Sequence, residues 1–339
     1  MPLSIFVKKS HNIWLRAWYG DSRWIYCLLP LSWLFAIISS ARKFVLTRFF
    51  QKKISVPVII VGNISVGGTG KTPLLIAMAK YLQSQGHKPG VVSRGYGGKV
   101  EQYPYLLNEK TKASESGDEP LLIYRAAQCP VCVAPDRVAA ALALVQEGCT
   151  HILSDDGLQH YQLGRAMEIA VVDGKRLFGN QQLLPVGPLR EPCSRLKSVD
   201  LVVVNNLINH ESLSEFHPVH AMKIQPKAWM HIASRKLMPL NDVFFKTPIH
   251  AVAGIGNPER FFKTLDDLSL NYYAHHFPDH YQFSEIDFEN YHHDTVVMTE
   301  KDAVKCGEFP KSEWYSLVVD AHLSGHFWSD FQHKLDSKN

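Results

Sequence analysis

A glycine-rich loop between an apolar strand and an apolar helix constrains this chain more than any other feature. Residues 57–80 read PVIIVGNISVGGTGKTPLLIAMAK. The β-branched run at 58–61 predicts a buried strand, the glycines after it predict an irregular loop, and residues 74–82 predict a helix. In this order the elements form a phosphate cradle, because backbone N–H groups and the positive helix end attract phosphate oxygens while Lys71 adds a charge. The Thr72 hydroxyl is then placed to hold Mg²⁺.

The predicted contacts to ATP are the residues of this loop and the start of the helix: Ser65, Val66, Gly67, Gly68, Thr69, Gly70, Lys71 and Thr72. The usual G-x-x-x-x-G-K-T spacing places glycine at position 65, where this chain has serine. The paired glycines 67 and 68 partly compensate, because glycine lets the backbone approach a ligand closely. An ordinary glycine-rich turn before a helix is the alternative interpretation.

Size and composition narrow the class of protein. A length of 339 residues predicts two domains, and 46% hydrophobic residues suffice for buried cores. The net charge of +4 gives no indication of nucleic-acid binding, and no obligate protein partner is inferred. The six cysteines are too scattered for a disulfide framework. Cys129 and Cys132 have metal-ligand spacing, but no second such pair completes a zinc site, which favours a turn entering a strand.

An uncharged N-terminal segment, residues 24–41, predicts contact with a membrane. As a helix it would be roughly 27 Å long, slightly short of a typical hydrocarbon core. A short span and a helix lying in the interface both fit, and a buried helix on a soluble domain is the alternative. The segment is followed by a group of basic residues, which favours the cytoplasmic face: Arg42, Lys43, Arg48, Lys52 and Lys53.

After this segment, short apolar runs alternate with helical stretches. The alternation predicts an α/β fold like that of P-loop NTPases, with a mostly parallel sheet and with phosphate bound at the carboxyl ends of its strands. HAMKIQ and KAWMHIA, on either side of Pro226, alternate in polarity and predict a two-stranded antiparallel ribbon. A second strand–helix alternation after the ribbon predicts a smaller α/β domain.

We therefore predict four parts and a ligand cleft between two lobes. The parts are a membrane-associated helical segment at 1–53, a nucleotide-binding domain at 54–215, a ribbon linker at 216–248 and a smaller C-terminal domain at 249–339.

Acidic residues at the end of a predicted strand are candidates for holding the metal. Asp155 and Asp156 follow the apolar run at 152–154. Carboxylates side by side resist joint ionisation without a cation, so the pair favours a nearby metal ion. Asp173 also follows an apolar run and is the competing candidate, although an Asp-Gly turn explains it equally well.

Three other segments carry polar residues with open interpretations. Asp118 and Glu119 precede a helical run, where acids commonly cap a helix. Arg190 lies in a rigid loop, LLPVGPLREP, and suits a phosphate, although a solvated pair with Glu191 is the alternative. His280 follows a predicted strand, and imidazole can move protons near neutral pH.

A series of motifs in one order resembles the tetraacyldisaccharide 4'-kinase family, the membrane-associated kinases of lipid A biosynthesis. The motifs are GNISVGGTGKTP, SRGYGG, SGDEP, SDDGLQH, LLPVGPLREP, FPDHY and MTEKDAVK, and they cover nearly the whole chain. The resemblance implies an ATP-dependent enzyme with Mg²⁺ that phosphorylates the 4'-hydroxyl of a tetraacylated glucosamine disaccharide 1-phosphate. It also implies a place at the bacterial inner membrane, with the catalytic domains on the cytoplasmic face.

The resemblance also implies roles for particular residues. Asp118 matches the family's catalytic carboxylate, His280 its partner in a dyad, and Lys71 the lysine that neutralises charge on the transferred group. With Thr72, the implied metal environment is Glu119, Asp155 and Asp156, and the implied substrate contacts are Gln159, His160 and Arg190. No role is assigned to the TEKD segment at 299–302.

Two functions of other classes remain as alternatives. The first is a membrane-surface P-loop ATPase that acts as a nucleotide switch. Many such switches carry a lysine before the paired glycines, where this chain has Val66. The second is an ATP-dependent ligase or synthase of a cofactor pathway, which would not need the apolar N-terminal helix.

Overall fold

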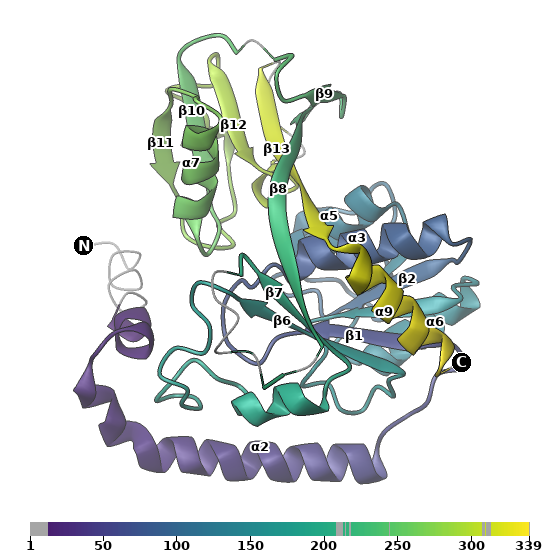
Figure 1. Cartoon of the computed structure of the whole chain (residues 1–339). Coiled ribbons are helices and arrows are strands. Elements are labelled where there is room, and N and C mark those ends of the chain that lie inside the picture. The colour runs from purple at the N-terminus through teal and green to yellow at the C-terminus, as the bar shows by residue number, and fades with distance from the viewer. Residues whose placement is uncertain are drawn as a thin grey trace. The chain divides into compact units, whose positions relative to one another are not determined.

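Figure 1 shows the computed structural model, which describes residues 13–207, 213, 215–216, 218–243, 245–306, 309 and 313–338. Within them the chain forms two compact units. The first unit draws on Met1–Lys71, Thr150–Lys223 and Leu323–Asn339, and the second on Thr72–Cys149 and Ile224–His322. Each unit is therefore assembled from segments that are distant in the sequence. The linear domain boundaries expected from the sequence stay predictions.

The first unit begins with an apolar helix. A 3₁₀ turn, η1 (Arg23–Leu28), leads into α2 (Leu29–Phe49). Pro30 lies in the first turn of α2, where the missing N–H has no helical partner to lose. Ser32 is the buried residue of α2, whereas Trp33, Ile37 and Phe44 are exposed. In the described part of the chain, Arg23–Phe49 is the one helix long and apolar enough to cross a membrane.

A parallel sheet forms the core of the first unit. Its strands are ordered β8-β7-β6-β1-β5, and their bounds are β1 (Val58–Gly62), β5 (His151–Asp155), β6 (Met167–Asp173), β7 (Leu201–Asn205) and β8 (Val219–His231). All residues of β1, β5 and β7 are buried, which explains the near-continuous apolar sequences of β1 and β7. Val61 of β1 is in register with Asp155 of β5, so the glycine loop and the paired acids follow adjacent strand ends. The short η2 (Cys193–Ser198) and the helix α9 (Gly325–Asp336) complete the unit.

The second unit contains the helices that follow the glycine loop. Strands β2 and β4 are parallel, and β3 pairs with β4 in the antiparallel sense. The elements are α3 (Lys71–Ser84), β2 (Pro89–Ser93), β3 (Tyr105–Leu106), α4 (Ala113–Ser116), α5 (Asp118–Ala127), β4 (Val131–Val133) and α6 (Arg137–Gln146). Asp136 caps α6, because its carboxylate accepts hydrogen bonds from the N–H groups of Val138 and Ala139.

The C-terminal part of the second unit is a second set of parallel strands, in the order β11-β10-β12-β13. Its elements are β9 (Leu237–Pro239), β10 (Ile249–Ala253), α7 (Pro258–Asp267), β11 (Tyr273–His276), η4 (Glu285–Phe288), β12 (Thr295–Thr299), α8 (Glu300–Ala303) and β13 (Trp314–Leu323). Trp229, Phe261 and Phe262 anchor one apolar core cluster, and Phe288 and Trp314 anchor another. The mostly parallel α/β fold expected from the sequence is confirmed.

The antiparallel ribbon is placed differently from the prediction. HAMKIQ and KAWMHIA are not paired strands, since both belong largely to the single long strand β8. Its antiparallel partner is β9, with Trp229 opposite Met238. Pro226 lies between the stretch of β8 that pairs with β7, which ends at Met222, and the stretch that pairs with β9. A proline is tolerated in a strand where its absent N–H is not needed, and therefore Pro226 does not end β8.

Candidate active site

The glycine loop is held in a conformation that only glycine adopts easily. Gly67 and Gly70 have φ values of 109° and 96°, in the left-handed region. Two side-chain amides fix the loop through its carbonyl oxygens. Asn205 Nδ2 donates to the carbonyl oxygen of Thr69 at 3.0 Å, and Asn63 Nδ2 donates to that of Gly67 at 3.3 Å. Both contacts use carbonyl oxygens of the loop, whereas the N–H of Val66 donates to the carbonyl oxygen of Pro188 at 2.9 Å.

The loop also offers space and an unused polar atom. Thr69 is buried, and its Oγ1 has no hydrogen-bond partner among the described residues. A Cβ added to Gly68 would meet no atom of the described residues within 4 Å. A buried hydroxyl without a partner is unfavourable unless a ligand supplies one. These features fit a phosphate group in the cradle.

Lys71 and Arg190 share one carboxylate at the end of β5. Lys71 Nζ lies 3.4 Å from Asp156 Oδ1, and Arg190 Nη1 lies 2.9 Å from Asp156 Oδ2. These three residues form the loop cluster. The carboxyl ends of β1 and β5 bring them together, as expected for a parallel α/β sheet. Two cations around one carboxylate leave positive charge available to an anion.

Gln159 connects the loop cluster to neighbouring loops. Its Nε2 donates to Glu191 Oε1 at 2.7 Å and to the carbonyl oxygen of Asn63 at 3.1 Å, and its Oε1 accepts from Arg190 Nη1 at 3.3 Å. His160, the next residue, accepts a hydrogen bond from Arg165 Nη2 through its carbonyl oxygen at 2.6 Å. The structure therefore brings Gln159 and Arg190 together.

Glu191 has a role that was not deduced from the sequence. It is buried and contacts Arg195 Nε at 3.2 Å and Lys43 Nζ of α2 at 3.5 Å. The alternative of a solvated pair between Arg190 and Glu191 is wrong, because Glu191 is buried and forms its ion pairs with Arg195 and Lys43, whereas Arg190 pairs with Asp156. The i, i+4 spacing to Arg195 was the available sequence signal, although only the fold shows that the pair is buried.

The second unit brings together Asp118 and His280. Asp118 is the first residue of α5 and is 5% exposed, and His280 follows β11 with φ of 57°. His280 Nδ1 lies 3.0 Å from Asp118 Oδ2 and 3.2 Å from Oδ1. A carboxylate only accepts hydrogen bonds, so the proton of this contact lies on Nδ1. Asp118 Oδ1 also accepts from the N–H of Glu119 at 3.1 Å, which fits the helix-start role considered for it.

The charges around Asp118 keep it ionised. Burial by itself raises the pKa of Asp118, but the hydrogen bond from His280 and the positive charge of Lys301 act against burial, and the pKa is lowered. The hydrogen bond to Asp118 raises the pKa of His280, while burial and Lys301 act downward. The lowered pKa of Asp118 and the raised pKa of His280 describe one pair, in which the carboxylate is charged and the imidazole carries a proton on Nδ1.

The predicted metal donors are distributed over both units. Asp155 is buried at the end of β5, Asp156 belongs to the loop cluster, Thr72 is the second residue of α3, and Glu119 Oε1 lies 3.0 Å from Lys301 Nζ. No group of three or more His, Cys, Asp or Glu side chains that could hold a metal occurs among the described residues. Mg²⁺ often takes only one or two protein carboxylates together with phosphate oxygens, so Asp155 and Asp156 of the first unit fit that ion by themselves.

The competing acid, Asp173, terminates β6 in a turn. Its Oδ1 accepts hydrogen bonds from the N–H groups of Lys175 at 2.9 Å and Arg176 at 3.1 Å. This is the turn interpretation that the sequence left open, and it occupies the carboxylate.

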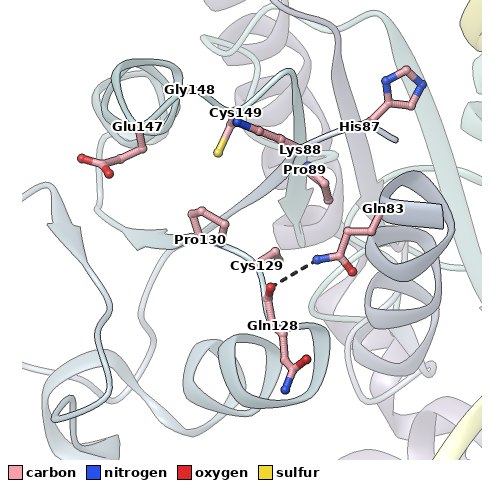
Figure 2. A pocket seen from close by; sticks show the side chains of 10 residues that line it. All are labelled: Gln83, His87, Lys88, Pro89, Gln128, Cys129, Pro130, Glu147, Gly148 and Cys149. Atoms are coloured by element: carbon pink, nitrogen blue, oxygen red, sulfur yellow. Dashed lines mark hydrogen bonds between the residues drawn. The ribbon is translucent and has the colours of Figure 1, made fainter. Parts of the chain in front are cut away.

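Cys129, the first residue of the cysteine pair, lines a hollow at the amino-terminal ends of two strands (Figure 2). The hollow has a volume of about 220 Å³ and is lined by Gln83, His87, Lys88, Pro89, Gln128, Cys129, Pro130, Glu147, Gly148 and Cys149. It precedes β2 and β4, whereas ligands of such sheets bind at the carboxyl ends. Burial raises the pKa of Cys129 and Cys132 to about 12, which keeps both thiols protonated.

A family model, two relatives and a solved structure each match this chain over most of its length. A family model described as LpxK, tetraacyldisaccharide-1-P 4'-kinase, matches residues 24–336. The tetraacyldisaccharide 4'-kinase of Nitrosococcus oceani is 46% identical over 318 residues, which cover 92% of this chain and 91% of the relative. That of Hahella chejuensis is 45% identical over 333 residues, covering 95% and 96%.

Among solved structures, this chain is similar to LpxK from Aquifex aeolicus, described as an apo form in complex with ATP. The two are 27% identical with a TM-score of 0.75, and the match covers 92% of this chain and 99% of that chain. The similarity extends over the described parts of both units.

Proposed function

The chain belongs to the tetraacyldisaccharide-1-P 4'-kinase family, and from this premise we propose how its residues carry out the reaction. The protein is a kinase of lipid A biosynthesis, as its motifs predicted. The proposed reaction transfers the γ-phosphoryl group of ATP to the 4'-hydroxyl of a tetraacylated glucosamine disaccharide 1-phosphate, which gives lipid IVA.

We assign the phosphates of ATP to the glycine loop, residues 65–72. The support is the left-handed backbone of Gly67 and Gly70, the position of Lys71 at the start of α3, and the Thr69 hydroxyl, which finds no partner in the described part of the chain. When bound, Mg²⁺ would neutralise negative charge on the phosphate oxygens, with Asp155 and Asp156 of the first unit as the carboxylates to hold it or its water. Thr72 and Glu119 stay donors predicted from the sequence. Gln159, His160 and Arg190 are assigned to substrate or phosphate.

The observation that carries the proposal is the pair of Asp118 and His280. An alcohol is a poor nucleophile, and a positioned carboxylate accepts its proton as the new bond to phosphorus forms. Asp118 suits this task, because it is ionised and its orientation is set by the 3.0 Å contact with His280 Nδ1. The proposal thus assigns the phosphates to the first unit and the acceptor's proton to the second.

We further place the enzyme on the cytoplasmic face of the bacterial inner membrane. The support is the helix Arg23–Phe49, with a mean hydropathy of 1.7 and only 11% of its most apolar window buried. Trp33, Ile37 and Phe44 are each more than half exposed, at 64%, 67% and 66%. Apolar side chains exposed on this scale along one helix are typical of a membrane-contacting surface.

Contacts of α2 favour a helix that lies in the interface over one that spans the bilayer. Ser32 Oγ donates to the carbonyl oxygen of Leu183 at 3.0 Å, and Lys43 Nζ lies 3.5 Å from Glu191 Oε2. The two contacts are roughly 16 Å apart along the helix axis. A helix attached at both points to the loop 183–191 runs along the first unit, and therefore one face remains for lipid.

Radiolabelled ATP and a tetraacyl disaccharide 1-phosphate acceptor test the proposed reaction. We expect label from the γ-phosphate to appear in a lipid product on thin-layer separation, with ATP lost in equal amount. The same acceptor with its 4'-hydroxyl methylated is the control and should stay unlabelled. Loss of ATP without labelled lipid would instead favour the nucleotide-switch ATPase.

A further inference from the structure

The lysine of the TEKD segment contacts three carboxylates at once. Lys301 Nζ lies 3.0 Å from Glu119 Oε1, 3.4 Å from Asp279 Oδ1 and 3.7 Å from Asp118 Oδ2. Its side chain is only 18% exposed, so these contacts are largely screened from water. The first and last of the carboxylates belong to the start of α5, and Asp279 precedes His280 in the loop after β11.

The other residues of the segment hold Lys301 in place. Thr299 Oγ1 accepts a hydrogen bond from the N–H of Asp302 at 3.1 Å, which caps α8. The buried Asp302 accepts from the N–H of Gly254 at 3.0 Å and pairs with Lys305 Nζ at 2.7 Å. These partners fix α8 on the ends of β10 and β12, and they leave Lys301 as the member of the segment that faces Asp118.

The charges explain what Lys301 contributes. Asp118, Glu119 and Asp279 are three negative groups around one cation, and without that cation they would repel one another. Burial lowers the pKa of Lys301, but the three carboxylates outweigh it and raise the pKa overall, so Lys301 is charged at any physiological pH. Its charge therefore joins the α5 start, which carries Asp118, to the loop that carries His280.

We propose that Lys301 is a positioning residue for the Asp118–His280 pair, because its ammonium bridges Glu119 and Asp279 and so keeps the imidazole on the carboxylate. The inference rests on the proposed function, in which Asp118 accepts the proton of the acceptor hydroxyl. Lys301 itself needs no contact with the substrate in this role.

The substitution Lys301→Met tests the proposal, since methionine keeps most of the side-chain length and removes the charge. We expect kcat to fall by up to about 10²-fold, the loss typical of a misplaced reacting group, with the KM for ATP unchanged. Lys301→Arg, which keeps the charge, should recover part of the activity. Lys263→Met, which removes an exposed lysine of the same unit, is the matched control and should behave like the wild type.

The separation of kcat from KM provides a readout that a loss of folding would not imitate. A partly unfolded enzyme would lose turnover and ATP binding together. A misplaced Asp118–His280 pair should lower kcat at an unchanged KM for ATP, and the charge kept by Lys301→Arg should restore part of the loss, because the ammonium contacts Glu119 and Asp279 at 3.0 and 3.4 Å.

Two outcomes separate this inference from the proposed function. A Lys301→Met enzyme with wild-type kcat, alongside an inactive Asp118→Ala enzyme, overturns the role of Lys301 alone. An active Asp118→Ala enzyme overturns the proposed function instead. If Lys301→Met fails to fold by circular dichroism, the same kinetics on Asp279→Asn decide, because this change removes the charge at one end of the bridge. A lowered kcat at an unchanged KM for ATP supports the positioning role, and a wild-type kcat contradicts it.

Discussion

The loop cluster of the first unit and the Asp118 cluster of the second are built from the same kinds of side chain in opposite proportions. In the loop cluster, Lys71 and Arg190 surround the single carboxylate of Asp156. In the Asp118 cluster, which comprises Asp118, Glu119, Asp279, His280 and Lys301, one ammonium serves three carboxylates. An excess of cations suits the binding of phosphate, and an excess of carboxylates suits the acceptance of a proton.

The two clusters also differ in how they depend on the backbone. The loop cluster lies beside a loop whose glycines have left-handed φ values and whose carbonyls are held by amides. The Asp118 cluster joins a helix start to the loop after β11 through side chains alone. Substitutions in the first cluster should therefore weaken ligand binding as well as turnover, whereas those in the second should lower the rate of the chemical step and leave ATP binding unchanged.

The largest effect is expected for Asp118→Ala. Removing a general base costs about 10²–10⁴ in rate, and we expect a loss of kcat in that range with the KM for ATP unchanged. Steady-state kinetics on lipid acceptor measure it. Asp136→Ala is the matched control, because it removes another acid from a helix start of the same unit and should lower stability by about 1 kcal/mol without lowering kcat. Normal lipid phosphorylation by Asp118→Ala would refute the general-base role.

Lys71→Met tests the cation excess of the loop cluster. We expect kcat to fall by about 10²–10³, as for loss of one group that stabilises developing charge, together with weaker binding of ATP. Binding of a fluorescent ATP analogue and turnover should both be measured. Lys80→Met, which removes an exposed lysine from the same helix, should change neither. Unaltered ATP binding by Lys71→Met would contradict the assignment of phosphate to this cluster.

A smaller loss of turnover is expected for His280→Gln, because orientation is lost while the base remains. The substitution also has a defined pH dependence. The hydrogen bond to Asp118 raises the pKa of His280 above 6.5 in the folded protein. The protonated imidazole therefore stabilises the fold fully below pH 6.5, and this stabilisation is lost as the pH rises through the raised pKa of His280. Urea unfolding of wild type and variant should show a difference that shrinks towards high pH. A loss of kcat equal to that of Asp118→Ala would argue that His280 itself takes the proton.

The smallest effect on stability is expected for Gly68→Ala. A Cβ at this position meets open space, so the free energy of unfolding should change by less than about 0.5 kcal/mol. The same methyl group would occupy space assigned to phosphate, and the KM for ATP should rise. Gly67→Ala, where φ is 109°, is the contrast and should destabilise the protein itself. An unchanged KM in Gly68→Ala would show that phosphate does not approach this part of the loop.

Local patterns predicted the first cluster better than the second. Strand, glycine loop and helix are adjacent in the sequence, so the position of Lys71 could be predicted from a 24-residue stretch by periodicity and turn chemistry. The spacing around Asp118 indicated a helix start, which is correct, and its role came only from the family resemblance. Its partner His280 lies 162 positions away, and no local pattern relates the two.

The sequence by itself determined the strand, loop and helix around Lys71, the α/β class and the family, because these depend on periodicity and on motifs of a few residues. Only the tertiary structure decided the partners of individual charges. Glu191 pairs with Arg195 and Lys43 rather than with its neighbour, Lys301 faces three carboxylates, and β8 continues through Pro226. The physical reason is that the energy of a charge, or of a missing hydrogen bond, depends on the groups that surround it in space. The number of residues between two groups along the chain does not specify those surroundings.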